Sequence, residues 1–255
     1  MTYHTPKRDV AEKSQDACEN NEMGNTHFKN NDFIKAIHHY RQAVKTYDNA
    51  DVYNNIGISY QNLRMFSKAL ENHQRSIEIK KNRNALSNMG NVYYYLKEYT
   101  NSINCYKNAL KMNYDDQVAY NMSFPYMAKG DFETGYQLYE KRLLLRSKPG
   151  DLHQRLEIPQ LEYWNGKDSC SRLLVVGEQG IGDNFLYFRY IIELSQKFPA
   201  MNITYLCRGI ISHVFRKYPR IHVVKSIPCV YIISCKAYIM SLPFVLGKSS
   251  IYPSD

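Results

Sequence analysis

The chain has 255 residues, which allows one or two domains, and its 44% hydrophobic and 22% charged residues are ordinary for a folded globular protein. The 33 basic and 24 acidic residues give a formal net charge of +9, and the basic residues are spread along both halves. Nucleic-acid binders concentrate Lys and Arg on one face, so this scatter indicates a solvated basic surface and disfavours nucleic acid as a partner.

The sequence also disfavours a membrane segment and a metal site. The N-terminal stretch is polar, and the apolar runs near the C-terminus fall far short of the roughly 20 residues that span a bilayer. Six cysteines form no CxxC pair, and no histidine cluster stands at zinc spacing. We therefore expect reduced thiols that fill the core of a cytoplasmic protein, with no membrane partner and no metal.

An internal repeat with a period of 33 residues occupies the first half. Aromatic residues mark it, each after a short polar connector: Phe33, Phe66, Tyr99 and Phe132. A small residue recurs at the same spacing, at Gly24, Gly57, Gly90 and Ser123. Two packed helices per repeat explain the pattern, because small residues let paired helices approach and aromatic residues fill the gaps between them.

Each helix pair leaves a face uncovered until the next pair stacks on it, so several copies are needed. The period predicts an α superhelix of four helix pairs over residues 18–148, preceded by a flexible N-terminus at residues 1–17. The order of small and aromatic positions resembles tetratricopeptide repeats shortened by one residue, and it lacks the TPLH-like segment of ankyrin repeats. This resemblance implies a concave surface that binds a protein or peptide.

Asparagines recur two residues before the small position, at Asn55, Asn88 and Asn121, and the first repeat has Glu22 there. Carboxamides on the inner helix of each pair could bind an extended peptide backbone without reading its sequence. The repeat domain is similar to that of O-linked N-acetylglucosamine transferase, whose asparagine ladder holds substrate peptides. The alternative is that these asparagines bridge their neighbours on the helix surface.

The run Tyr93, Tyr94, Tyr95 cannot lie on one helix face. Tyr93 falls at a core position of the repeat. We therefore expect at least one of the other two rings to be exposed.

Pro149-Gly150 ends the helical pattern, and residues 149–171 form a connector. Residues 172–255 then alternate between short apolar runs and helical spacing, which predicts an α/β Rossmann-like lobe with a parallel sheet. The expected strands are residues 173–176, 202–207, 221–224 and 229–234, and the expected helices are residues 183–198 and 209–219.

The loop "GEQGIGD" follows the first of these strands. Its glycines are spaced GxxGxG, which matches neither the dinucleotide fingerprint nor a P-loop. In parallel sheets the functional crevice lies at the carboxyl ends of the strands, so this loop brings backbone N–H groups and a helix N-terminus towards a ligand. Asp183 is expected at or near the helix N-cap, a position that needs no catalysis.

The segment "EYWNGK…RLLVVGEQGIGDNFLYFRYI", with "YEKR" before it and "SLPFVLGKSSIYP" after it, resembles bacterial-type tetratricopeptide-repeat proteins that carry a heptosyltransferase-like glycosyltransferase domain of the GT-B type. The resemblance implies that Asp183 is the base that activates the acceptor, or else a helix cap only. It also implies that Glu178, Gln179, Gly180 and Gly182 form the acceptor loop. Arg189, two turns further along the helix, is expected in a structural ion pair.

Glycosyltransferases of this type have two lobes, and this chain shows only the acceptor-side lobe. No cofactor is expected in this chain; a nucleotide-sugar donor would need a second lobe. Enzymatic activity is therefore left open between two alternatives: a contribution to glycosyl transfer onto a protein acceptor, and a non-catalytic protein-interaction scaffold. An unpaired sheet edge would favour a homo-oligomer.

Overall fold

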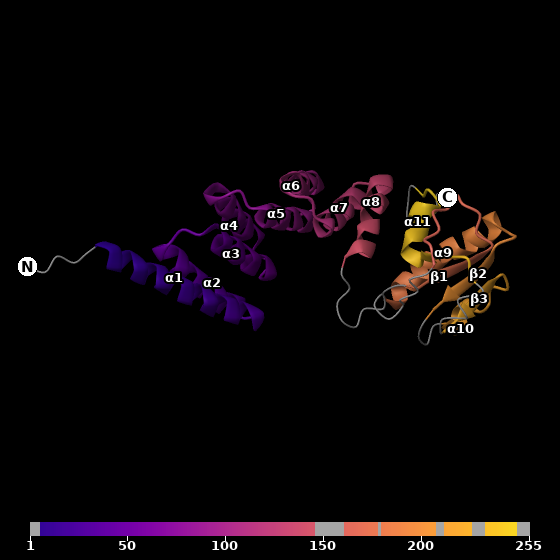
Figure 1. Cartoon of the computed structure of the whole chain (residues 1–255), viewed down its shortest axis with the longest axis horizontal. Coiled ribbons are helices and arrows are strands. Elements are labelled where there is room, and N and C mark those ends of the chain that lie inside the picture. Colours follow the sequence, from indigo (N-terminus) through magenta and orange to yellow (C-terminus); the bar gives the residue numbers. More distant parts are fainter. Residues whose placement is uncertain (1–5, 146–160, 178–179, 208–211, 226–232, 249–255) are drawn as a thin grey trace, which may run out of the picture. The chain divides into compact units, whose positions relative to one another are not determined.

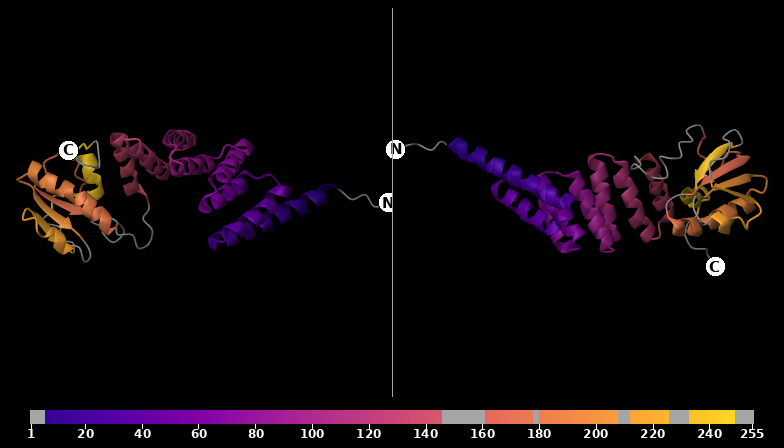
Figure 2. Two further views of the ribbon diagram at one scale, coloured as in Figure 1. Left: turned by 180° about the vertical axis from the view of Figure 1, so that it is seen from behind. Right: turned by 90° about the horizontal axis from the view of Figure 1, so that it is seen from below.

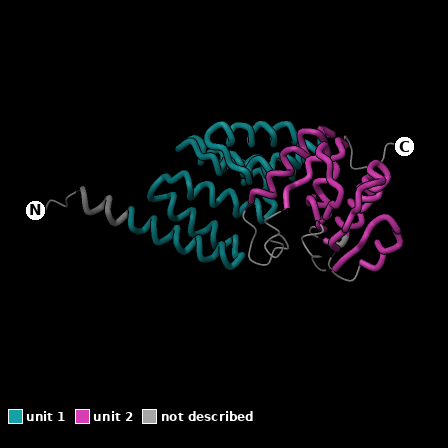
Figure 3. Tube along the Cα trace, turned by 45° about the vertical axis from the view of Figure 1, so that its right-hand side comes forward, with its two compact units in different colours: residues 1–129 teal, residues 130–255 magenta. Residues whose placement is uncertain are grey.

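The computed structural model describes residues 6–145, 161–177, 180–207, 212–225 and 233–248. The chain forms two compact units, residues 1–129 and residues 130–255 (Figures 1 and 3).

The described part of the first unit, residues 6–129, forms seven α-helices, and successive helices pack against each other. They are α1 (Pro6–Lys29), α2 (Phe33–Thr46), α3 (Ala50–Asn62), α4 (Phe66–Ile79), α5 (Arg83–Tyr95), α6 (Tyr99–Met112) and α7 (Asp116–Ala128). The result is the expected tetratricopeptide-like superhelix (Figures 1 and 2). Helix α1 begins at Pro6, so the segment expected to be a flexible N-terminus is helical from that residue onward.

The backbone itself repeats with the sequence period. Asn31, Arg64 and Lys97 all adopt the left-handed conformation, with φ between 57° and 61°, and each ends the turn between the two helices of a pair; Gly130, at the same spacing, has φ +86°. This conformation stops the first helix and lets the chain reverse into the second.

The small residues of the repeat allow the close approach that their spacing predicted. A Cβ atom placed on Gly24 would lie 2.5 Å from the ring of Tyr40, and one on Gly90 would lie 2.8 Å from the ring of Tyr106. Both rings are almost fully buried. Glycine is therefore required at these positions by packing between the paired helices.

The second unit begins with helix α8 (Phe132–Tyr139) and the 3₁₀ helix η1 (Glu140–Leu144). A four-stranded parallel sheet follows, with β1 (Arg172–Val176), β2 (Asn202–Leu206), β3 (Ile221–Val224) and β4 (Cys235–Tyr238) in the order β3-β2-β1-β4. The remaining elements are α9 (Ile181–Lys197), α10 (Ser212–Phe215), the 3₁₀ helix η3 (Ile239–Ser241) and α11 (Leu242–Val245).

Apolar side chains bury both faces of the sheet. Helix α9 covers one face (Figure 2), where the rings of Phe188 and Phe215 lie with centroids 4.2 Å apart beside Tyr205. On the other face Leu174, Val176, Leu206 and Tyr238 pack with Leu143, Leu161, Val224 and Ile233. Burial on both faces explains why the strand sequences are continuously apolar.

The first three strands occur where the sequence predicted them, but the fourth does not. It comprises residues 235–238, whereas the prediction placed it at residues 229–234, of which only 233 and 234 are described and neither is in a strand. Both segments are apolar, so local pattern could not separate them. The pairing of Leu173 with Cys235 and of Val176 with Tyr238 fixes the strand.

The expectation of six reduced thiols is also corrected. Cys170 and Cys235 form a disulfide, with Cα atoms 6.3 Å apart. They are 65 residues apart in sequence and meet because Cys170 leads into β1 while Cys235 opens the neighbouring strand β4. The argument for a reducing compartment therefore does not hold for this pair.

Within the described ranges, none of the helices combines the length and the apolar composition that a membrane span requires.

Candidate functional site

The chain offers two candidate sites, one in each unit. The first is the loop after β1. The strand order reverses at β1, because β2 and β3 extend the sheet on one side while β4 lies on the other. Ligands of parallel α/β sheets bind at the carboxyl ends of the strands at such a reversal. Gly177 and the first residues of α9 lie at this point.

Asn184 holds this loop in place. Its side chain donates to the carbonyl oxygen of Gly180 at 2.9 Å and accepts from the hydroxyl of Tyr205 at 2.5 Å. A Cβ atom on Gly177 would lie 2.7 Å from the Asn184 side-chain oxygen, so only glycine fits there. The sequence analysis did not single out Asn184, although its position one residue after "GIGD" was a usable signal.

Gly180 and Gly182 lack the crowding found at Gly177. A Cβ atom on Gly182 would have no neighbour within 4 Å, and one on Gly180 would only reach the Asp183 carboxylate at 3.7 Å. Neither residue has a φ in the left-handed region. Neither steric crowding nor backbone conformation therefore explains these two glycines.

Asp183 is the third residue of α9 and supplies one half of a capping box, because its Oδ2 accepts from the backbone N–H of the N-cap residue Gly180 at 3.3 Å, while glycine has no side chain to supply the other half. The side chain is partly exposed, and no described group pairs with Oδ1. The helix cap is thus present, and among the described residues the second carboxylate oxygen has no partner. Glu178 and Gln179 lie outside the described residues.

The ion pair expected for Arg189 is not found within the described ranges. The Arg189 guanidinium instead donates to the hydroxyl of Tyr190 at 2.9 Å, and its Cζ lies 4.7 Å from the centroid of the same ring. Its Nε is buried without a hydrogen-bond acceptor. Residues 189 and 190 are adjacent on α9, and no carboxylate of the described chain lies close enough to compete with the ring.

Two motifs distant in sequence meet beside α8. Arg142, in the "YEKR" segment, donates to Glu140 at 2.6 Å and to the hydroxyl of Ser241 at 2.9 Å, and Ser241 begins the "SLP" segment. The hydroxyl of Tyr139 also contacts the sulfur of Met240 at 3.7 Å. The Arg142 side chain is only 6% exposed. These motif residues therefore stabilise the second unit.

The tryptophan of the connector is structural as well. Trp164 is buried, its ring nitrogen donates to the carbonyl of Asp168 at 2.8 Å, and its ring packs edge-on against Phe198. Gly166 adopts φ +82°, and a Cβ atom there would lie 2.6 Å from the carbonyl oxygen of Val245. Both residues of the "W-x-G" pattern are thus required by packing.

Burial shifts the pKa of two ionisable groups at the sheet. It raises the pKa of the Cys207 thiol and lowers the pKa of the Lys236 ammonium. Cys207 is therefore not a reactive thiolate at neutral pH.

The second candidate site is the inner face of the repeats. Helix α3 packs against α5, and α5 packs against α7, in closer contact than any between α2, α4 and α6. The first helices of the pairs therefore form the inner, concave side of the superhelix. Beyond the second residue of each, α3, α5 and α7 contain no Asp, Glu, Lys or Arg.

The predicted asparagine ladder lies on these helices, and its members are half-buried. Asn88 donates to Asn54 of the preceding repeat at 3.0 Å, and Asn121 accepts from Gln117 at 2.9 Å. Asn55 makes no side-chain hydrogen bond with the described residues. The bridging alternative thus holds for Asn88, while Asn55 and the amide nitrogen of Asn121 keep their donors available.

Asn54 is a second residue that the sequence analysis missed. Its side-chain oxygen accepts from Asn88 and lies 3.0 Å from Nδ1 of His73, which is fully buried. In the first and third repeats a tyrosine stands at the His73 position and donates to an asparagine one turn further along, Tyr40 to Asn25 and Tyr106 to Asn91. Burial lowers the pKa of His73 to about 4.

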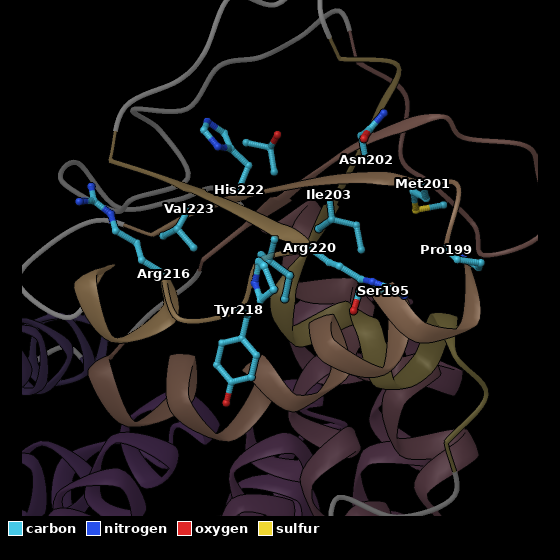
Figure 4. Close-up of a pocket in the computed structure, with 13 residues that line it drawn as sticks. Ser195, Pro199, Met201, Asn202, Ile203, Arg216, Tyr218, Arg220, His222 and Val223 are labelled. Carbon is cyan, nitrogen blue, oxygen red and sulfur yellow. The ribbon is translucent and has the colours of Figure 1, made fainter.

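A hollow beside the sheet lies elsewhere, at the amino ends of β2 and β3 (Figure 4). It has a volume of about 680 Å³ and is lined by Arg216, Arg220 and His222 among other residues. The side chains of Arg216 and Arg220 point in opposite directions (Figure 4), so they do not converge on one anion. This hollow does not include the predicted loop.

Within the same described ranges, no group of three or more His, Cys, Asp or Glu residues is arranged to hold a metal ion. His27, His38 and His39 do gather at the α1–α2 turn, with the rings of His27 and His39 stacked at 5.2 Å.

Comparison with known proteins supports the repeat assignment. The tetratricopeptide-repeat family model matches residues 84–113, which span most of α5 and all of α6. No curated protein matches the chain.

Solved structures with a related helical arrangement include MamA from Desulfovibrio magneticus RS-1, with 14% identity over 50% of this chain and 74% of that chain and a TM-score of 0.46. A tetratricopeptide repeat protein from Parabacteroides merdae ATCC 43184 has 19% identity over 56% and 57% of the two chains and a TM-score of 0.46. The first such domain of Spaghetti (RPAP3), bound to the HSP90 peptide SRMEEVD, has 19% identity over 50% and 95%, with a TM-score of 0.41.

The chain thus carries a tetratricopeptide repeat at residues 84–113, and the 33-residue period of the sequence extends the same pattern to the neighbouring helices of the unit.

Proposed function

We propose that the chain is a peptide-binding protein and that its inner repeat face holds an extended peptide through the carboxamides of Asn55, Asn88 and Asn121. The observation that carries the proposal is the inner face itself: α3, α5 and α7 present recurring carboxamides and carry no charge beyond their first two residues. A carboxamide both donates and accepts, as a peptide backbone does, so it binds main chain with little regard to side chains.

The test is a peptide-binding measurement with the double variant Asn55→Ala and Asn121→Ala. Asn88 is left in place because its bond to Asn54 joins α3 to α5, so its loss would also affect folding. The double variant should bind an uncharged library peptide at least tenfold more weakly, since two backbone hydrogen bonds are lost.

The matched control is Asn104→Ala with Asn108→Ala, two exposed asparagines on the outer helix α6. Equal affinity in the double variant, the control and the unaltered chain would reject the asparagine ladder as the peptide site.

A second candidate function, acceptor binding in glycosyl transfer, is supported by the loop after β1. Gly180 and Gly182 are open on their Cβ side, and Asp183 keeps one carboxylate oxygen beside the helix N-terminus. In this scheme a peptide hydroxyl attacks the anomeric carbon of a nucleotide-sugar, Asp183 takes the hydroxyl proton, and the nucleoside diphosphate leaves. The donor would be held by a second lobe.

Asp183→Asn distinguishes the two roles of this residue. Asparagine keeps an oxygen that can accept from Gly180, so the cap and the melting temperature should be preserved, but it cannot take a proton. Incubation of the full chain and a bound peptide with nucleoside-diphosphate sugars and a separately expressed donor-binding lobe, followed by peptide mass spectrometry, should show transfer that Asp183→Asn abolishes. Absence of transfer with every sugar in that mixture would remove the catalytic role of Asp183 and leave peptide binding as the function of this chain.

A further inference from the structure

Aromatic rings from the outer helix α4 and the inner helices α5 and α7 form a continuous series. Phe66 stacks on Tyr95 with centroids 5.8 Å apart, Tyr95 lies 6.0 Å from Tyr94, and Tyr94 lies 6.2 Å from Phe124. We name Phe66, Tyr95, Tyr94 and Phe124 the aromatic strip. Tyr95 is 58% exposed, which confirms the expectation that one ring of the tyrosine run faces solvent.

One residue of the aromatic strip lies on the face of the asparagine ladder. Tyr95 follows Asn88 by seven residues, and Asn62, which lines the pocket described below, follows Asn55 by seven, so each pair lies on one helix face two turns apart. Two turns correspond to roughly 10 Å along the helix. A ligand of a few residues held by the ladder would therefore reach the strip.

A small pocket lies at the end of the strip. It has a volume of about 180 Å³ and is lined by Gln61, Asn62, Arg64, Phe66 and Tyr95. The side-chain oxygen of Gln61 is buried and accepts no hydrogen bond. Because a buried acceptor without a donor is costly, this oxygen is suited to a ligand N–H.

We infer that the aromatic strip and its pocket select a proline-rich segment in the polyproline II conformation. The inference rests on the proposed function and names the class of peptide. Proline rings pack on aromatic-lined grooves, and a polyproline II chain makes no internal hydrogen bonds, so its carbonyls remain for the carboxamide donors of the ladder. The non-proline positions of such a segment supply the N–H for Gln61.

The scarcity of charge and the size of the pocket fit this ligand. The inner helices carry no charge beyond their first two residues, and the pocket is lined by a single cation, Arg64, which could pair with only one of the several carboxylates of an acidic peptide. The pocket is smaller than the 300 Å³ or more typical of sites for drug-sized molecules, and it suits a single pyrrolidine ring. Three residues of polyproline II cover roughly 9 Å, close to the distance between ladder and strip.

The experiment measures fluorescence anisotropy of three labelled peptides with the full chain. The first repeats Pro-Ala-Pro, the second replaces every proline with alanine, and the third is the acidic peptide SRMEEVD. We expect the proline peptide to bind at least tenfold more tightly than the other two, with little dependence on ionic strength because no charge pair is screened.

Tyr95→Ala should weaken binding of the proline peptide about tenfold, while Tyr95→Phe should keep most of the affinity because the ring remains. Tyr47→Ala is the matched control, since Tyr47 is 62% exposed at the end of the outer helix α2. Circular dichroism melting verifies that the variants are folded.

Three other results would contradict the inference, and they differ in whether the proposed function survives. Equal binding of the proline and alanine peptides, sensitive to Asn55→Ala with Asn121→Ala but not to Tyr95→Ala, overturns this inference and leaves the proposed function standing. Preferential, salt-sensitive binding of the acidic peptide overturns it in favour of carboxylate recognition. Failure of all three peptides, together with the uncharged library, rejects both proposals.

Discussion

The guanidinium of Arg142 donates to the hydroxyl of Ser241 at 2.9 Å, across 99 residues of sequence. The same side chain pairs with Glu140 at 2.6 Å and lies over the ring of Tyr139, with its Cζ 4.5 Å from the centroid. This contact links the 3₁₀ helix η1 after the last repeat helix to η3 beyond the sheet. Arg142 therefore ties α8 and the sheet into one unit.

Arg142→Ala should destabilise the second unit by about 2–3 kcal/mol, because charged hydrogen bonds of a buried side chain are lost. Arg142→Lys should recover only part of this, since an ammonium cannot bridge two partners with the fixed geometry of a guanidinium. Trp164, the single tryptophan, lies in this unit, so urea unfolding followed by its fluorescence reports the change. Unaltered unfolding in Arg142→Ala would show that the contact adds no stability.

His73 makes the stability of the repeats depend on pH. Burial lowers its pKa from 6.5 to about 4, so the unfolded chain binds a proton more readily than the folded chain. The associated stability is fully present above pH 6.5 and is lost as the pH falls towards 4, by about 3 kcal/mol. Urea unfolding of the helices, followed by far-ultraviolet circular dichroism across this range, measures the loss.

The control for this prediction is the double variant His73→Tyr with Ile58→Asn. It rebuilds in the second repeat the tyrosine–asparagine hydrogen bond of the first and third repeats. Its stability should vary less between pH 6.5 and 4 than that of the unaltered chain. Parallel pH profiles of the two proteins would show that His73 is not the titrating group.

Two glycine substitutions should have opposite effects. Gly90→Ala places a Cβ atom 2.8 Å from the ring of Tyr106, which is buried and hydrogen-bonded to Asn91, and should cost about 1–3 kcal/mol. Gly182→Ala meets no atom within 4 Å in the first turn of α9 and should stabilise the fold by about 0.5–1 kcal/mol.

Thermal melts of the two glycine variants give the comparison. A loss of stability in Gly182→Ala would mean that this position is packed more tightly than the structure indicates. Stabilisation combined with reduced glycosyl transfer would identify Gly182 as a residue kept for ligand approach.

The disulfide between Cys170 and Cys235 can be tested by counting the cysteines that an alkylating agent labels. Unfolding without reductant in the presence of an alkylating agent should label four of the six cysteines, and reduction should expose the remaining two. Cys170→Ser should lower stability by about 4 kcal/mol in the chain-entropy description of a loop of this length. Alkylation of all six cysteines without reductant would show that the bond is absent from the purified protein.

The sequence alone determined the parts of the fold that depend on local spacing. The 33-residue recurrence of glycine and aromatic residues predicts the helix pairs, because such a repeat can bury its apolar face only by stacking. The first three strands were predictable for a similar reason, since short apolar runs bounded by turns fit a sheet buried on both faces. The helix cap by Asp183 follows from its place near the start of a helix.

Only the tertiary structure decided the features that join distant segments. The fourth strand is Cys235–Tyr238 because it pairs with β1, and that pairing also brings Cys170 to Cys235. Asn88 hydrogen-bonds to Asn54 because consecutive inner helices are in contact, and Arg142 donates to the distant Ser241 in addition to its local contacts. Such contacts depend on which surfaces meet after folding, and the chain's local periodicity does not encode that choice.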